Sequence, residues 1–74
     1  MKYTVQDIGR LIRETRRNLG VTQKALALTS GTGLRFIIEV EKGKQTSEIG
    51  KVLTILQTLG IQLTLTPPPA TNRG

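Results

Sequence analysis

The side chains that could do chemistry in this chain are mostly cations. Eleven Lys and Arg stand against five Asp and Glu, which leaves a net charge of +6 on 74 residues. The chain has no Cys and no His, which excludes disulfides, thiol or imidazole nucleophiles and the usual zinc sites. The five carboxylates form no pattern typical of an acid–base pair, so we expect no enzyme, no cofactor and no metal. The charge predicts a polyanionic partner, although a basic surface that serves only solubility would have the same composition.

Helical periodicity predicts the elements that position these cations. Thr4 and Asp7 have the spacing of a capping box and open a helix that ends at Gly20. The apolar face of this helix holds Ile8, Leu11, Ile12 and Leu19. A later helix begins at Thr46 or Ser47 and ends at the glycine that follows its apolar stripe. That stripe holds Ile49, Val52, Leu53, Leu56 and Leu59. The two stripes predict amphipathic helices that enclose one core.

Between these helices, small and branched residues occur in the order that a helix-turn-helix requires. We predict helices over residues 22–29 and 34–42, joined by a tight turn over 30–33. Ala27 is small enough for the second helix to cross closely, and Gly31 can supply the positive φ that a sharp turn needs. The residues expected on the buried face of the second helix are Phe36, Ile37 and Val40. This arrangement predicts a recognition helix offered to a DNA major groove.

After the last helix, the pattern changes from helical to alternating. Residues 61–66 place apolar side chains on one face and polar side chains on the other. Because no second segment alternates in this way, we expect the strand to pair with its own copy across a two-fold axis. An extended tail packed on its own helices is the alternative. The predicted dimerisation residues are Ile61, Gln62, Leu63, Thr64, Leu65 and Thr66. We therefore expect one DNA-binding domain over 1–66 and a flexible tail over 67–74.

These residues resemble the Xre/Cro-type helix-turn-helix regulators, and more narrowly the HipB-like branch found in Hip-type toxin–antitoxin modules. The similarity extends from Ile8 to about Leu65. The motifs that carry it are Thr22-Gln23, Leu26-Ala27, Arg35-Phe36-Ile37, Glu41-Lys42-Gly43-Lys44 and Gly50-Lys51-Val52-Leu53. The chain departs from the common pattern at Leu34 and Glu39, which make its recognition helix more apolar and less basic.

The resemblance implies an all-α fold, a lambda-repressor-like domain of four to five helices with a short C-terminal β-strand pairing across a dimer. It implies a dimeric repressor that binds a palindromic double-stranded DNA operator upstream of its own operon. It also implies a HipA-like serine/threonine kinase toxin as a partner, with the antitoxin in the cytoplasm at the nucleoid. No apolar run is long enough to cross a bilayer, so we expect no membrane partner.

The predicted DNA contacts divide into phosphate contacts and base contacts. Phosphate contacts are expected at the N-terminus of the second helix and in the loop after the third. The residues expected there are Thr22, Gln23, Lys24, Lys42, Lys44, Gln45 and Thr46. Arg35 is expected to read guanine through two hydrogen bonds. The residues expected to line the groove beside it are Thr32, Gly33, Leu34 and Ile38.

Alternatives remain open for single residues and for the function. Gln23, Lys42 and Lys44 are equally typical of a solvated surface, and Leu34 and Ile38 also suit the core or a dimer contact. A second function is an interaction adaptor that holds a kinase-like partner, with secondary DNA binding or none. The acidic and apolar residues of the recognition helix favour this alternative. A third function, a phage-type repressor without a toxin partner, differs only in gene neighbourhood.

Overall fold

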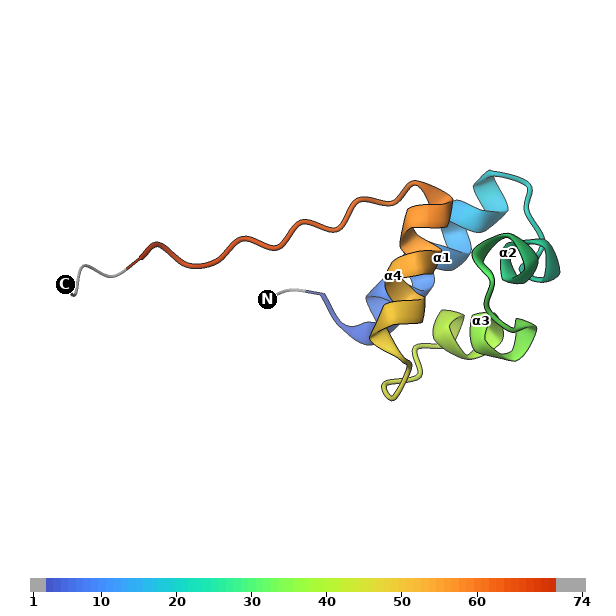
Figure 1. Cartoon of the computed structure of the whole chain (residues 1–74), viewed down its shortest axis with the longest axis horizontal. Helices are drawn as coiled ribbons and strands as arrows, with labels where there is room; N and C mark the ends of the chain where they lie inside the picture. Colours follow the sequence, from blue (N-terminus) through green and yellow to red (C-terminus); the bar gives the residue numbers. More distant parts are fainter. Residues whose placement is uncertain (1–2, 71–74) are drawn as a thin grey trace.

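The computed structural model describes residues 3–70, which form four helices and no β-strand (Figure 1). The helices are α1 (Val5–Asn18), α2 (Gln23–Ser30), α3 (Leu34–Glu41) and α4 (Ile49–Leu59). The predicted helix-turn-helix fold is confirmed, with four helices rather than five in the described part of the chain. Within that part, no helix is both long enough and apolar enough to cross a membrane.

Side-chain caps begin α1 and α2 at the predicted residues. Thr4 Oγ1 accepts the N–H of Asp7 at 3.1 Å, and Asp7 Oδ2 accepts the N–H of Thr4 at 3.0 Å, which completes the capping box. Thr22 Oγ1 accepts the N–H of Ala25 at 3.0 Å. Each cap satisfies an amide that the helix itself leaves without a partner.

The start of α4 differs from the prediction. This helix begins at Ile49, and its N-cap residue Glu48 makes no side-chain capping bond. Ser47 Oγ donates instead to the carbonyl oxygen of Lys44 at 2.8 Å. The hydroxyl therefore closes a turn in the α3–α4 loop, which is a common competing use of serine.

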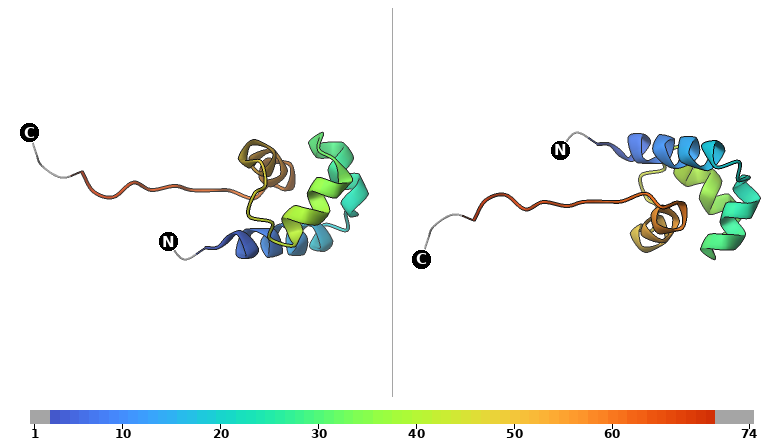
Figure 2. Two further views of the ribbon diagram at one scale, coloured as in Figure 1. Left: turned by 90° about the horizontal axis from the view of Figure 1, so that it is seen from below. Right: turned by 90° about the horizontal axis from the view of Figure 1, so that it is seen from above.

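The core lies where α2 packs on α3 and α4, and α1 packs on the same two helices. Figure 2 shows α1 and α4 on opposite sides of the body, with α2 and α3 at the end away from the two termini. The buried apolar cluster consists of Ile12, Leu26, Ala27, Ile37, Val40, Ile55, Leu56 and Leu59. The predicted inward positions of the helix-turn-helix at Ala27, Ile37 and Val40 are confirmed.

Four residues expected in the apolar stripes of α1 and α4 are exposed. Leu11 and Leu19 are 44% and 58% exposed, and Ile49 and Leu53 are 74% and 38% exposed. These predictions were wrong because helical spacing predicts which side of a helix is apolar. It does not predict which residues on that side the neighbouring helices cover. On α4, which packs against both α1 and α2, the fully buried residue is Ile55.

The backbones of α1 and α3 approach closely at Gly9. A Cβ at this position would collide with the carbonyl oxygen of Val40 and crowd that of Glu41. Because glycine has no side chain, it allows this contact, and it sets the spacing of the two helices. Gly9 was not predicted from the sequence, since a glycine inside a helix by itself signals only lower helix propensity.

The C-terminal arm, residues 61–70, leaves the body as an extended segment on the side away from α2 and α3 (Figures 1 and 2). Ile61 is half-buried and donates its N–H to the carbonyl oxygen of Leu56 at 2.8 Å, whereas the arm from Gln62 onward is exposed. The β-strand expected over 61–66 is not supported by the single chain. A strand requires a partner for its backbone groups, and no other segment of residues 3–70 is paired with it. The last four residues of the predicted tail lie outside the described residues.

Candidate nucleic-acid interface

The turn between α2 and α3 is fixed by hydrogen bonds around Gly31. This residue has φ 72°, the left-handed conformation that a glycine adopts without a Cβ clash. The N–H of Thr32 donates to the carbonyl oxygen of Ala27 at 3.0 Å and ends α2. The buried Ser30 Oγ donates to the carbonyl oxygen of Leu26 at 2.7 Å and lies 2.9 Å from Thr32 Oγ1. These bonds fix the direction in which α3 leaves the turn.

One face of α3 is buried and the opposite face is open to solvent. Ile37 and Val40 are buried, whereas Arg35, Ile38 and Lys42 follow one another at helical spacing on the other side. Arg35 and Lys42 are exposed and Ile38 is half-buried. This face therefore offers two cations beside an apolar side chain. Such a set can bind guanine, phosphate and the methyl group of thymine.

Two other apolar residues of α3 lie at the edge of the core. Phe36, expected in the core, is only half-buried, and Lys51 Nζ lies 5.4 Å from the centre of its ring. The ring packs against the buried apolar cluster, so Phe36 belongs to the edge of the core, where an ammonium group from α4 approaches it. Leu34 is 43% exposed at the start of α3, so its side chain is accessible at the end of the helix that faces the turn.

A buried ion pair joins α1 to the end of α3. Arg16 Nε and Nη2 donate to the two carboxylate oxygens of Glu41 at 2.6 Å and 3.1 Å. Arg16 Nη1 also donates to the carbonyl oxygen of Val21 at 2.9 Å. The side chains of Arg16 and Glu41 are only 10% and 3% exposed. Bidentate geometry and the additional bond satisfy both buried charges.

The N-terminus of α2 joins the same network through Gln23. Its Nε2 donates to Glu41 Oε1 at 3.0 Å, so Glu41 accepts hydrogen bonds from both α1 and α2. Lys24, the next residue, is exposed. The network holds the start of α2 against the end of α3, the two places where phosphate contacts were predicted. Arg16 and the buried role of Glu41 were not predicted from the sequence, because the two residues lie 25 positions apart.

The loop between α3 and α4 contains the remaining predicted phosphate contacts. Lys44 Nζ lies 3.1 Å from Glu39 Oε1 in a partly exposed ion pair. Lys42, Gln45 and Thr46 are exposed. The structure therefore brings the loop to the end of α3, next to the predicted base-contact face. Its two lysines differ, because Lys44 already has a carboxylate partner.

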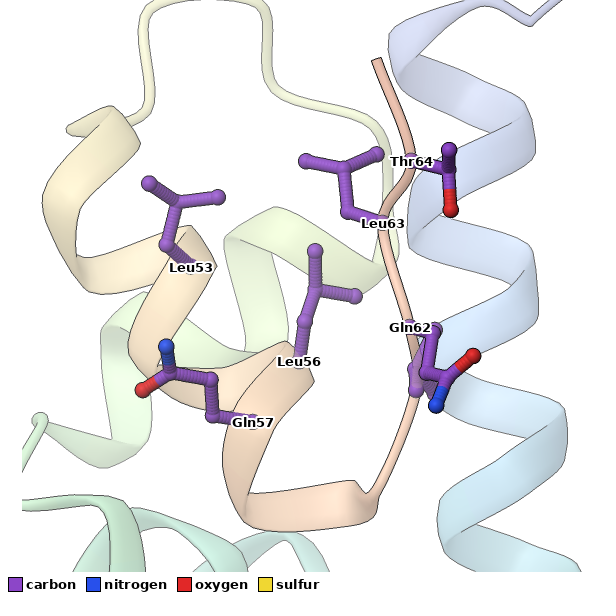
Figure 3. Close-up of a pocket in the computed structure, with 7 residues that line it drawn as sticks. Leu53, Leu56, Gln57, Gln62, Leu63 and Thr64 are labelled. Atoms are coloured by element: carbon purple, nitrogen blue, oxygen red, sulfur yellow. The ribbon is translucent and has the colours of Figure 1, made fainter.

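The predicted dimerisation residues begin with Ile61, which packs on the core, and continue along the arm that leads away from α2 and α3 (Figure 1). Leu63 points toward Leu53 and Leu56 of α4, whereas Gln62 and Thr64 point to the other side of the arm (Figure 3). A cavity of about 520 Å³ lies between α4 and the arm. The expected alternation of the arm is therefore present, and its apolar side faces an open apolar surface.

The short turn, the exposed face of α3 and the cations around it define a DNA-binding domain of the helix-turn-helix class. A sequence profile described as "Helix-turn-helix domain" matches residues 9–65. The chain is 48% identical over 65 residues to the HTH-type transcriptional regulator y4mF of Sinorhizobium fredii, which covers 88% of this chain and 86% of that protein. The chain belongs to the helix-turn-helix family of transcriptional regulators, and the expected resemblance to HipB is confirmed at the level of the fold.

Solved structures share the fold over most of the chain. A HipA–HipB–O2–O3 complex and a complex of HipB with an O4 20mer each match with a TM-score of 0.80 and 24% identity, covering 90% of this chain and 94% of the matched chain. The restriction-modification controller protein C.AhdI from Aeromonas hydrophila matches with a TM-score of 0.70 and 28% identity, covering 78% of this chain and 88% of that chain. The HipB structures, at this level of identity, show the fold of the chain and no more.

Proposed function

We propose that this regulator is a dimeric repressor that recognises a palindromic operator with α3. The observation that carries the proposal is the set of cations at the α2–α3 end. Lys24, Arg35 and Lys42 are exposed, and none of them pairs with a carboxylate within residues 3–70. Exposed cations without an internal partner are available to replace the counterions of DNA phosphates, which is the main source of affinity.

Arg35 is the proposed base contact. It lies in the first turn of α3, on the face opposite the buried Ile37, so a helix placed in the major groove would bring its guanidinium to the base edges. Two parallel hydrogen bonds to guanine O6 and N7 would give about 1–3 kcal/mol of discrimination. The residues proposed to line the groove beside it are Thr32, Gly33, Leu34 and Ile38.

The proposed phosphate contacts flank this helix on two sides. At the start of α2, Gln23 gives its amide to Glu41, and a second N–H of the same NH₂ group is left for a phosphate oxygen. Thr22, which caps the helix, and Lys24 complete this contact. In the α3–α4 loop, Lys42 is the stronger candidate, since Lys44 is already paired with Glu39. The remaining proposed contacts are Gln45 and Thr46.

The proposed dimer uses the C-terminal arm. Leu63 and Leu65 are 49% and 76% exposed in the single chain, and the backbone of residues 62–66 is unpaired. Pairing of residues 61–66 with the same segment of a second copy would satisfy that backbone and cover these side chains. Two recognition helices would then read two half-sites about 34 Å apart. A single short helix reads too few base pairs to define an operator.

The proposal for the operon and the partner is based on the structural similarity to HipB. We propose that the operator lies upstream of the regulator's own gene and that a HipA-like serine/threonine kinase is bound by the regulator. The support is the HipA–HipB–O2–O3 complex, whose HipB chain has the same fold. Co-purification of the chain with the product of the neighbouring gene tests this part of the proposal. Recovery of the regulator without that product would contradict it.

The adaptor alternative depended on the acidic residues Glu39 and Glu41 and on the apolar residues Leu34 and Ile38 of α3 as a recognition surface for a partner. Glu41 is buried against Arg16, and Glu39 pairs with Lys44. Internal partners therefore account for both carboxylates, and we favour the DNA-binding function.

Fluorescence anisotropy with labelled DNA tests the repressor function. The probes are the DNA upstream of the regulator's gene and a duplex of the same composition in shuffled order, both at about 0.15 M salt. We expect the upstream DNA to bind about 10³-fold more tightly or better, as is typical of specific recognition. Equal affinity for the two duplexes would contradict sequence-specific repression.

A further inference from the structure

Two arginines of α1 are left unexplained by the proposed contacts. Arg13 and Arg17 are both exposed and lie one helical turn apart. Neither pairs with a carboxylate within residues 3–70, although two neighbouring arginines do: Arg10 with Asp7, and Arg16 with Glu41. Arg13 and Arg17 are thus exposed cations without a carboxylate partner in this part of the chain, like the cations at the α2–α3 end.

The position of Arg13 on α1 is set by the contacts of its neighbours. It follows Gly9 by four residues and precedes Arg16 by three, so the three share one side of the helix. Gly9 touches the backbone of Val40, and Arg16 holds Glu41. Arg13 therefore lies on the side of α1 that packs against α3, at its exposed edge.

The same edge of α1 continues toward other basic segments of the surface. Gln6, two turns before Arg13, lies directly against Gly43 of the α3–α4 loop, and this glycine separates Lys42 from Lys44. At the other end, Arg17 lies in the last turn of α1, just before the segment that leads to the start of α2. The edge thus connects the two places where phosphate contacts are proposed.

Carboxylates do little to neutralise this edge. Of the five acidic residues, four are already engaged in ion pairs within the described residues. Glu14 is the exception: it is rotated about 100° from Arg13 around the helix, and although it precedes Arg17 by three residues, the two form no ion pair within the described residues. The excess charge on this part of α1 is therefore positive.

We propose that Arg13 and Arg17 form a second phosphate-binding track, which holds the backbone of the same duplex beside the groove that receives α3. The inference rests on the proposed DNA binding and adds to it a contact made by α1. Arginine suits this role because its planar guanidinium donates two parallel hydrogen bonds to phosphate. The contact would be independent of base sequence, since phosphates carry no sequence information directly.

The salt dependence of DNA binding tests the track. The affinities of the full chain and of the Arg13→Gln/Arg17→Gln variant are measured against salt concentration on the upstream DNA and on the shuffled duplex. We expect the slope of log K against log salt to become shallower by about 0.9 for each phosphate that is no longer bound, or about 1.8 per protomer, on both duplexes. Circular dichroism of the variant checks that α1 is intact, and glutamine is a good helix former.

Two control variants separate a specific contact from a general loss of charge. Lys51→Gln removes a cation that already pairs with Glu48 on α4, and it should leave the slope nearly unchanged. Arg13→Lys/Arg17→Lys keeps the charges and should keep the slope. An unchanged slope for the glutamine variant, with the parent chain binding DNA normally, would overturn the track alone. An equal decrease of the slope in Lys51→Gln and in Arg13→Gln/Arg17→Gln would also overturn it. Failure of the parent chain to bind any duplex would overturn the track and the proposed function together.

Discussion

The α2–α3 end of this regulator and its C-terminal arm differ in how many of their polar groups form hydrogen bonds within the single chain. At the α2–α3 end, a buried network of Arg16, Glu41 and Gln23 joins three helices, and the turn at Gly31 is closed by hydrogen bonds. Along the arm, from residue 62 onward, the side chains are exposed and the backbone is extended and unpaired.

This difference indicates that the helical body determines folding, whereas the arm is available for assembly with a second chain. The buried polar groups of the helical body find their partners within the single chain: no buried side-chain polar atom lacks a partner within residues 3–70. The arm has no such hydrogen-bond partners within the single chain. Its apolar residues nevertheless alternate with polar ones, as a half-buried strand requires. We therefore expect changes at the α2–α3 end to affect stability or DNA recognition, and changes in the arm to affect oligomeric state.

The largest expected effect comes from breaking the buried network. Glu41→Ala leaves the Arg16 guanidinium buried without its carboxylate and removes an acceptor from Gln23. We expect the free energy of unfolding to fall by about 3–5 kcal/mol, as measured by chemical denaturation. The double variant Arg16→Met/Glu41→Leu should recover most of this stability, because it leaves no buried charge without a partner. A decrease below about 1 kcal/mol for Glu41→Ala would match a surface ion pair and contradict the buried role of the network.

Removal of the arm, unlike Glu41→Ala, should change the oligomeric state and leave the stability of the helical body nearly unchanged. A chain that ends after Ile61 keeps the residue that packs on the core and loses the exposed part of the arm. We expect thermal unfolding of the helical body to change little, while sedimentation shows a monomer in place of a dimer. Operator affinity should fall by about 10²-fold or more, because the two half-sites are no longer linked. A dimer that survives this truncation would remove the arm from the proposed assembly.

Arg35→Ala should affect recognition without affecting folding or assembly. Because the side chain is exposed, we expect an unchanged unfolding transition and an unchanged dimer. Affinity for the upstream DNA should fall by about 1–3 kcal/mol per half-site, with a smaller decrease on the shuffled duplex. An equal decrease on the two duplexes would make Arg35 a phosphate contact, like the proposed role of Arg13.

The smallest expected effect concerns pH and the first turn of α1. The backbone N–H of Thr4 donates to the Asp7 carboxylate and lowers the pKa of Asp7 below its ordinary value of 3.8, with help from the Thr4 hydroxyl and Arg10. A lowered pKa contributes stability above the ordinary value, and this contribution is lost as pH falls through the folded value. We therefore expect the melting temperature to fall less steeply on acidification in Asp7→Asn than in the parent chain. Identical pH profiles in thermal unfolding would contradict this role of Asp7.

The sequence predicted those parts of the fold that depend on neighbouring residues. The caps at Thr4 and Thr22 and the turn at Gly31 are local, because each uses groups a few residues apart. The buried pair Ile37 and Val40 follows from helical spacing alone. These signals were sufficient to give the helix-turn-helix and the direction of its exposed face.

The sequence did not predict contacts between residues that are distant in the chain. Arg16 was one of several arginines on α1, and only the packing of α1 on α3 distinguishes it as buried. Gly9 was missed for the same reason, since its role depends on the backbone of Val40. For the site, the structure brings Arg35 of α3 and the start of α2 to the same end of the molecule (Figure 1). Their contacts with DNA remain predictions, because local pattern cannot distinguish a base contact from a phosphate contact.

Amide NMR spectra of the isotopically labelled full chain, recorded while the upstream DNA is added, test the central claim most directly. The claim is that the α2–α3 end binds DNA and that the arm serves assembly. We predict the largest shifts at the start of α2, along α3 and in the α3–α4 loop, with smaller shifts at the exposed edge of α1 around Arg13. Shifts confined to α4 and residues 61–66, with α3 unaffected, would contradict the claim.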